Sequence, residues 1–269
     1  APPLSGAVGA LLNMYVQHFG LSRPIFADGV AQDEAVFRTE AAAKLTRDLE
    51  IALSRKDSVA IVSGMSGTGK TTLAADALKS IDTRLAFSCI SQPPRTAHEL
   101  LEQLLTDFGF EAYRLSRVER IQQWRQFLSE MAATGTRVCL LIENADHYSP
   151  EVLDALHKLT AADAAMTPGA NIILTTTLPH ERLLTDDSML GFNQRVRLRR
   201  RIEPLSLDET GDYLEFKCRL GDIDPDTVMN IVVNQADIDH VPEGPTDLSA
   251  WGPAEAWSVL YLYAEIKVD

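Results

Sequence analysis

The chain has few cysteines and no long apolar segment. Its three cysteines, Cys89, Cys139 and Cys218, are an odd number and lack the spacing of a metal site. The first two lie inside apolar runs, so we expect buried thiols in a reducing compartment. No stretch approaches the roughly 18 uninterrupted apolar residues of a membrane span. Residues 7–14 are too short, and lack the basic flank, for a secretion signal.

Basic residues are also scarce, since 25 Lys and Arg stand against 38 Asp and Glu, for a formal net charge of −13. This charge disfavours unaided binding to nucleic acid or to an anionic membrane surface. The 269 residues, 45% of them hydrophobic, suffice for one large domain or two modest ones. Because Ala1 is not a natural start, we expect the chain to be an excised part of a longer protein.

One motif organises the chain. It fits the phosphate-binding pattern G-x-x-x-x-G-K-[ST] without a mismatch. An apolar run over residues 59–62 precedes it and a helical stretch over residues 73–80 follows it, which gives the strand, loop and helix that the motif needs. The predicted nucleotide-binding residues are Gly64, Met65, Ser66, Gly67, Thr68, Gly69, Lys70, Thr71 and Thr72.

Each residue type in this motif has a chemical role. Glycines let backbone N–H groups turn toward phosphate oxygens. Lys70 supplies a positive charge for the β- and γ-phosphates, and the hydroxyl of Thr71 can ligate Mg²⁺. The motif therefore predicts a nucleotide site.

Strand and helix signals alternate after the motif. Apolar runs predict strands over residues 85–90, 138–142 and 171–177, with a further strand over 199–205. Capping patterns and amphipathic spacing predict helices over residues 33–54, 96–108, 116–133, 149–162 and 206–220. Repeated strand-helix units predict an α/β fold with a parallel sheet covered on both faces.

The ordered series of motifs resembles the AAA+ P-loop ATPases, and within them the general-secretion-pathway, ExeA-type family, over roughly residues 12–221. Beside the P-loop, the matching segments are Phe19-Gly20-Leu21, Glu99-Leu100-Leu101, Asp107-Phe108-Gly109, Ser149-Pro150-Glu151, Asn193-Gln194-Arg195 and Glu203-Pro204-Leu205. The resemblance implies a three-layer sandwich with a five-stranded parallel sheet, ATP and Mg²⁺ as ligands, and the phosphates at the carboxyl ends of the strands.

It also implies self-association, with each site completed by an arginine finger from a neighbouring subunit. Arg195 is the matching residue, and the alternative is that residues 195–201 form a solvated basic edge.

The chain departs from the family at its second acidic motif. Where relatives have Asp-Glu, this sequence has Glu143-Asn144. The resemblance assigns Glu143 to the metal and Asn144 to the attacking water, but an amide can only hold water by hydrogen bonds. General-base catalysis commonly contributes about 10²–10⁴ in rate, so this change predicts a slow enzyme or a static ATP binder. Asp146 either substitutes for the missing base or bonds the following loop.

The γ-phosphate sensor should lie at the end of the strand over residues 171–177. Thr175, Thr176 and Thr177 each offer a hydroxyl, and the pattern does not choose among them. Thr177, the last of the three, is included in the predicted catalytic set with Lys70, Glu143, Asn144 and Arg195.

We predict three segments: an N-terminal aromatic linker over residues 1–32, an AAA+ domain over residues 33–221, and a divergent C-terminal lid or partner-docking segment over residues 222–269. The linker aromatics either pack in the core or contact adenine. After residue 222 the family's Gly-x-Pro-Arg lid element is not recognisable. Trp257 and Tyr261 fall at helical spacing there, which favours packing on the main domain over partner docking.

These features predict a cytoplasmic, Mg·ATP-binding AAA+ protein, a weak or assembly-dependent ATPase that assembles or remodels a secretion, pilus or export machine. Its partners would be copies of itself and proteins of that machine, with peripheral attachment to the inner membrane through a partner or a removed segment. One alternative is a non-hydrolysing ATP-dependent switch, which Asn144 motivates. Another is a transposition-type DNA helper, which the arginines of residues 195–201 support and the net charge opposes.

Overall fold

The computed structural model describes residues 36–81, 84–162, 168–177, 179 and 190–220. The chain divides into two compact units, one formed by residues 38–204 and the other by residues 1–37 with 205–269. In the second unit the described residues include helix α9 (Leu207–Leu220). The predicted linker over residues 1–32 and the predicted segment over 222–269 lie outside the described residues, so both stay predictions.

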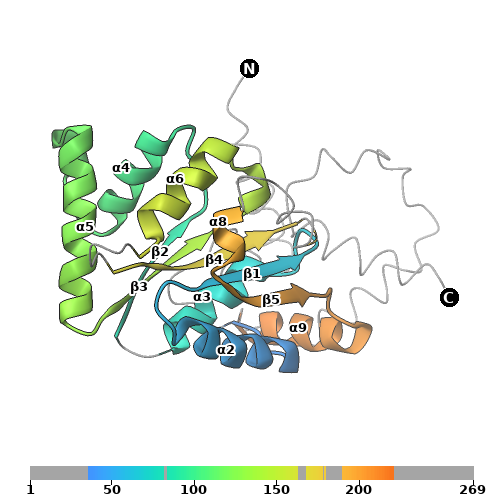
Figure 1. Ribbon diagram of the computed structural model, residues 1–269. Coiled ribbons are helices and arrows are strands. Elements are labelled where there is room, and N and C mark those ends of the chain that lie inside the picture. Colours follow the sequence, from blue (N-terminus) through green and yellow to red (C-terminus); the bar gives the residue numbers. More distant parts are fainter. Residues whose placement is uncertain (1–35, 82–83, 163–167, 178, 180–189, 221–269) are drawn as a thin grey trace, which may run out of the picture. The chain divides into compact units, whose positions relative to one another are not determined.

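The first unit is built on a five-stranded parallel sheet (Figure 1). The strands are β1 (Val59–Gly64), β2 (Leu85–Ile90), β3 (Arg137–Ile142), β4 (Asn171–Thr176) and β5 (Val196–Ile202), in the spatial order β2-β3-β4-β1-β5. Strands β1 and β4 are buried along their whole length, as expected for central strands of a parallel sheet. Because all strands run in one direction, their carboxyl ends meet at one edge.

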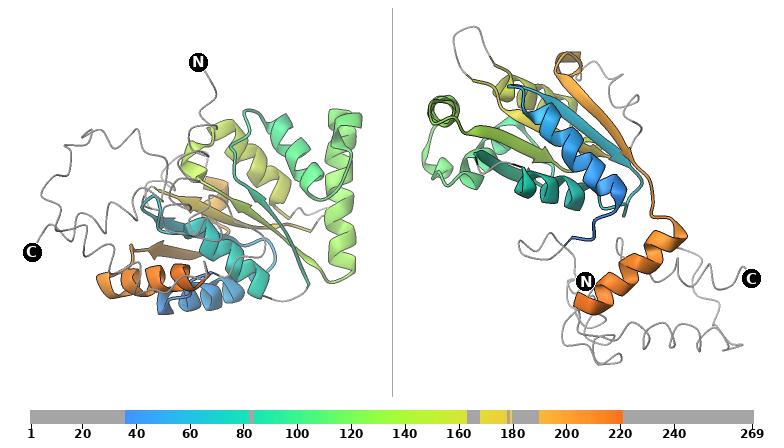
Figure 2. Two further views of the ribbon diagram at one scale, coloured as in Figure 1. Left: turned by 180° about the vertical axis from the view of Figure 1, so that it is seen from behind. Right: turned by 90° about the horizontal axis from the view of Figure 1, so that it is seen from below.

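Helices cover both faces of the sheet (Figures 1 and 2). On one face lie α2 (Glu40–Leu53) and α3 (Lys70–Ser80), and on the other α4 (Ala97–Asp107), α5 (Arg117–Ala133) and α6 (Pro150–Thr160). Each face of the sheet carries a hydrophobic core, and successive strand residues point to opposite faces. Ala60 therefore packs toward α2 and α3, while Ile61 packs on the opposite side. The predicted three-layer α/β fold is confirmed.

Short elements lie in the connections between these helices and strands. They are the 3₁₀ turns η1 (Ala112–Arg114) and η2 (Ala145–His147) and the short helix α8 (Leu190–Asn193). The capping box predicted at Ser116 is present, because its hydroxyl accepts from the Glu119 N–H and the Glu119 carboxylate accepts from the Ser116 N–H.

Two predicted boundaries are wrong. Helix α2 begins at Glu40 rather than near residue 33, because the hydroxyl of Thr39 accepts from the Ala42 N–H and caps the helix there. Strand β5 begins at Val196 rather than at residue 199, because Arg-rich positions that alternate with apolar ones still pair with β1.

Candidate nucleotide-binding site

The P-loop lies between the carboxyl end of β1 and the start of α3 (Figure 1). Gly67 and Gly69 have φ angles of 80° and 73°, in the left-handed region that favours glycine. Gly69 is also the N-cap of α3 and makes no side-chain cap. N–H groups in the first turn of such a helix can bind an anionic ligand, and the helix dipole favours negative charge there.

Gly64 is needed for a different reason, which is the close approach of β5. A Cβ atom added at Gly64 would lie 2.5 Å from the carbonyl oxygen of Ile202. The loop that follows is open to solvent at Met65, Ser66 and Gly67. The base of the P-loop is therefore tightly packed, while its tip is accessible.

Lys70 reaches back across the loop. Its side chain is buried, and its Nζ donates to the carbonyl oxygen of Met65 at 2.7 Å. Burial lowers the pKa of Lys70, and the carboxylates of Asp146 and Glu143 oppose this shift. The Thr68 hydroxyl donates to the same carbonyl at 2.9 Å, which closes the turn. The ammonium group is thus held at the loop, in the field of two acidic residues.

Thr71 and Glu143 form the candidate metal site. The Thr71 hydroxyl donates to Oε1 of Glu143 at 3.0 Å, which joins the first turn of α3 to the residue after β3. A hydroxyl and a carboxylate are oxygen ligands of the kind that Mg²⁺ takes, alongside waters and substrate phosphates. In the described part of the chain no cluster of three or more His, Cys, Asp or Glu could hold a metal alone. The residues fit Mg²⁺ that is shared with a nucleotide.

Asn144 adopts a left-handed conformation with φ 50° and ψ 56°. Its backbone N–H donates to the hydroxyl of Thr175 at 3.1 Å. Thr175 and Thr176 are fully buried, so Thr175 serves to fix this turn at the end of β3. Of the three threonines that the sequence left open, Thr177 alone is exposed.

Thr177 is bonded to Asp146. The Thr177 hydroxyl donates to Oδ2 of Asp146 at 2.5 Å, and its N–H faces Oδ1 at 3.3 Å. The Asp146 side chain is 7% exposed. Burial would raise the pKa of Asp146, but hydrogen bonds, chiefly from the Thr177 hydroxyl, outweigh it and lower that pKa. Asp146 therefore joins the ends of β3 and β4 through Thr177, and its Oδ2 also lies 4.0 Å from Nε2 of the following residue, His147.

Arg195 lies at the amino ends of the strands, and the P-loop lies at their carboxyl ends. The carbonyl of Arg195 accepts from the N–H of Val59, the first residue of β1, whereas the P-loop follows the last. The guanidinium is buried against its own subunit and forms an ion pair with Asp57. It also donates to the hydroxyl and carbonyl of Thr160 at 3.0 and 3.1 Å and to the Ala170 carbonyl at 2.9 Å.

These contacts give Arg195 a place in the interior of its own subunit and do not support the prediction that it is an arginine finger. A finger must reach a neighbour's γ-phosphate, and these contacts already engage the guanidinium inside the fold. No sequence pattern pointed to Asp57 or Thr160 as its partners. The alternative of a solvated basic edge fits Arg197, Arg199 and Arg201, which are exposed along β5.

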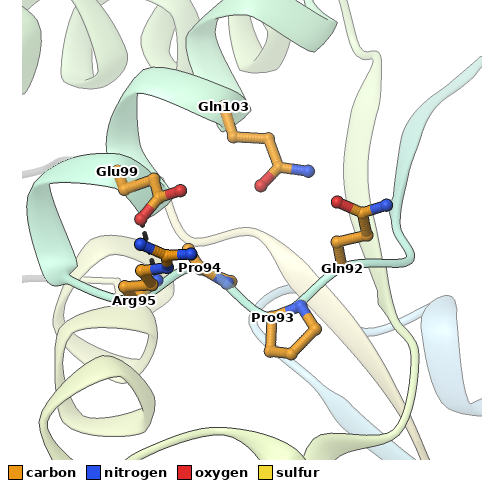
Figure 3. Close-up of a pocket in the computed structure, with 6 residues that line it drawn as sticks. All are labelled: Gln92, Pro93, Pro94, Arg95, Glu99 and Gln103. Atoms are coloured by element: carbon orange, nitrogen blue, oxygen red, sulfur yellow. Dashed lines mark hydrogen bonds between the residues drawn. The ribbon is translucent and has the colours of Figure 1, made fainter. Parts of the chain in front are cut away.

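A hollow of about 500 Å³ lies beyond the carboxyl end of β2 (Figure 3). Its lining residues are Gln92, Pro93, Pro94, Arg95, Glu99 and Gln103. The Arg95 N–H donates to Oε2 of Glu99 at 2.9 Å, which ties the loop to the start of α4. None of the predicted site residues lines this hollow.

Sequence comparison finds proteins that are similar to this chain. Residues 53–184 match the family described as an AAA domain. The chain is 25% identical over 208 residues to the general secretion pathway protein A of Aeromonas hydrophila, and the match covers 77% of this chain and 38% of that protein. The chain thus spans well under half the length of this curated relative.

Solved structures show the same fold at low identity. The ADP form of the Aeropyrum pernix ORC2 protein is similar with a TM-score of 0.59 and 13% identity, covering 79% of this chain and 60% of that one. The Aeropyrum pernix ORC1 protein in complex with DNA has a TM-score of 0.57 and 18% identity, covering 89% and 62%. CDC6P from Pyrobaculum aerophilum has a TM-score of 0.54 and 18% identity, covering 71% and 53%.

Proposed function

Because the chain belongs to the AAA+ P-loop ATPases of the general-secretion-pathway A (ExeA) type, we propose that residues 64–72 bind Mg·ATP and that the protein hydrolyses it slowly when assembled. The observation that supports this most is the contact between the Thr71 hydroxyl and Glu143 beside the glycine loop. It brings a P-loop hydroxyl and a strand-end carboxylate together, as a phosphate-bound metal requires.

The residues divide the work as follows. The backbone of Gly67 and Gly69 and the charge of Lys70 hold the phosphates. Thr71 and Glu143 hold Mg²⁺, which when bound would neutralise charge on the phosphate oxygens. Asn144 can orient water but cannot accept its proton near neutral pH, which supports slow turnover.

We further propose that the protein self-associates and serves a secretion, pilus or export machine. The similarity to general secretion pathway protein A supports this role. The described residues include no helix long and apolar enough to cross a membrane. From the similarity to general secretion pathway protein A, we propose a cytoplasmic location with peripheral attachment to the inner membrane through a protein partner.

A second candidate function is an ATP-held switch that does not hydrolyse its ligand. Asn144 favours it, because the proton acceptor common in relatives is replaced by an amide. ATP would then order the protein for docking, and exchange of ATP rather than turnover would release it.

The test is Mg·ATP turnover measured over a range of protein concentrations, with ATP binding measured on the same samples. Lys70→Ala is the inactive control, and Lys79→Ala, an exposed lysine in the last turn of the same helix, is the matched control. Turnover per subunit that rises with concentration and disappears only in Lys70→Ala would support the ATPase. Tight binding without turnover at any concentration would support the switch, and no ATP binding would refute both.

A further inference from the structure

We propose that Thr177 and Asp146 together accept the proton of the attacking water, in the place of the carboxylate that is missing at Asn144. This inference rests on the proposed ATP hydrolysis and deepens it. It assigns a catalytic role to Asp146, for which the family pattern provides no role.

The strand register places the pair beside the phosphates. Thr176 pairs with Ser63 of β1, so Thr177 follows at the level of Gly64, where the P-loop begins. Asp146 lies in η2, directly after the turn that the bond between Asn144 and Thr175 holds. The carboxyl ends of β3, β4 and β1 are neighbours in the sheet, so both residues lie at the edge that carries the P-loop.

The direction of the hydrogen bond decides what Thr177 can do. A threonine hydroxyl has one proton, and Thr177 donates it to Oδ2 of Asp146 at 2.5 Å. Its oxygen can then only accept further hydrogen bonds. Phosphate oxygens are also acceptors, so in this arrangement Thr177 cannot donate to a γ-phosphate. A water molecule can donate to it.

Asp146 is suited to receive the proton that Thr177 passes on. Its side chain is almost buried, and its two oxygens face the hydroxyl and the N–H of Thr177. These bonds favour the ionised carboxylate, and Lys70 lies within its field. A carboxylate held in this way keeps its negative charge near neutral pH and can accept a proton, and its lowered pKa makes it a weak base, which agrees with the slow turnover proposed above.

The chemical step balances as follows. A water molecule bonded to Oγ1 of Thr177 attacks the γ-phosphorus, and a new O–P bond forms. The bond between that phosphorus and the bridging oxygen breaks, and its electron pair leaves with ADP. The water proton moves to Oγ1 of Thr177 while the hydroxyl proton of Thr177 moves to Oδ2 of Asp146. Asp146 then returns the proton to the released phosphate or to solvent.

The test uses Asp146→Asn and Thr177→Val in the full chain, with Thr177→Ser as the conservative variant. Asp107→Asn is the matched control, because Asp107 accepts from the Ser88 hydroxyl at 2.5 Å on β2, away from the P-loop. We expect Asp146→Asn and Thr177→Val each to slow single-turnover hydrolysis by about 10²-fold, the lower end of general-base contributions, and to leave the ATP dissociation constant within about threefold. The double variant should be no slower than either single variant, since the residues act as a unit. Thr177→Ser and Asp107→Asn should hydrolyse ATP like the unsubstituted protein.

A second measurement does not depend on turnover. Capture of ADP with aluminium fluoride reports the state in which water is aligned, and capture with beryllium fluoride reports the bound ground state. We expect Asp146→Asn to lose the first and keep the second. Asn144→Glu added to Asp146→Asn should restore capture with aluminium fluoride, because it supplies the missing carboxylate.

Several results would overturn the proposal. Unchanged hydrolysis and unchanged aluminium fluoride capture in Asp146→Asn would show that Asp146 only supports the structure. A loss of ATP affinity in Thr177→Val as large as its loss of rate would show that Thr177 donates to phosphate. If the unsubstituted protein binds ATP without turnover, the proposed ATPase fails and the fluoride captures alone decide the role of the pair. If it binds no nucleotide, both proposals fail.

Discussion

Replacing Arg195 tests the assignment on which the structure and the family pattern disagree. If Arg195 belongs to the interior, Arg195→Ala should lower the free energy of unfolding. The substitution leaves the Asp57 carboxylate without its ion-pair partner, and it removes the donor to the carbonyls of Thr160 and Ala170. If Arg195 is instead an arginine finger, the same substitution should leave the stability unchanged and abolish ATP turnover.

The magnitude follows from the burial of the pair. Removing one partner of a buried ion pair typically costs about 3–5 kcal/mol, because the other charge stays behind without compensation. The Arg195 side chain is 9% exposed and that of Asp57 is 22% exposed, so Asp57 can regain some hydration. We therefore expect about 3 kcal/mol, at the lower end of that range. For a domain of this size that loss corresponds to a fall in Tm of roughly 6–12 °C.

The assay is urea unfolding followed by circular dichroism, with ATP binding and turnover measured at a temperature where each variant is folded. Arg199→Ala is the matched control, since Arg199 is exposed on the same strand, and it should change stability by less than about 0.5 kcal/mol. A stable Arg195→Ala protein that binds ATP but has lost concentration-dependent turnover would refute this reasoning and restore the finger assignment.

Three further predictions concern the P-loop, the metal and pH. Gly64→Ala should weaken ATP binding and lower Tm, because the added Cβ meets a carbonyl of β5 at 2.5 Å; binding and Tm equal to those of the unsubstituted protein would contradict the close approach. Glu143→Gln should raise the Mg²⁺ concentration needed for ATP binding by about tenfold, as loss of a metal-associated carboxylate commonly does, and a titration of Mg²⁺ at fixed ATP would show no shift if Glu143 is not a ligand. Burial, together with the charge of Arg195, lowers the pKa of His157, so the folded state disfavours its protonation. The stability that depends on neutral His157 is present above its unfolded pKa and is lost as pH falls through the lowered folded value. His157→Gln should therefore lose less stability than the unsubstituted protein between about pH 7 and pH 5, measured by urea midpoints, whereas an equal loss would argue against this linkage.

Much of the fold could be predicted from sequence because its signals are local. The P-loop pattern, the apolar run before it and the helix after it specify a strand, a loop and a helix within about 20 residues. The capping residues Ser116 and Ser149 start α5 and α6 where predicted, because a cap depends on residues three positions apart. The sequence analysis also assigned Thr71 and Glu143 to one metal site, because the family resemblance places the second acidic motif beside the P-loop, and the two side chains are in contact.

Only the tertiary structure decided the roles of residues whose partners are distant in sequence. Arg195 directly precedes the Arg-rich strand β5 in the sequence. Its distance from the P-loop became clear only once β5 was placed beside β1, with Arg195 bonded to the first residue of β1. The three threonines at the end of the predicted strand over residues 171–177 look alike in the sequence, since a strand buried on both faces has no alternation that would show which side chain is exposed.

The sequence by itself determined that this protein is a P-loop α/β domain, because backbone conformation in a motif is set by neighbouring residues. Only the sheet order β2-β3-β4-β1-β5 showed which threonine is accessible at the site. The same order places Thr177, after β4, next to Asp146, which follows β3. That order depends on pairing between segments as far apart in the sequence as Val59 and Val196, which local patterns do not record.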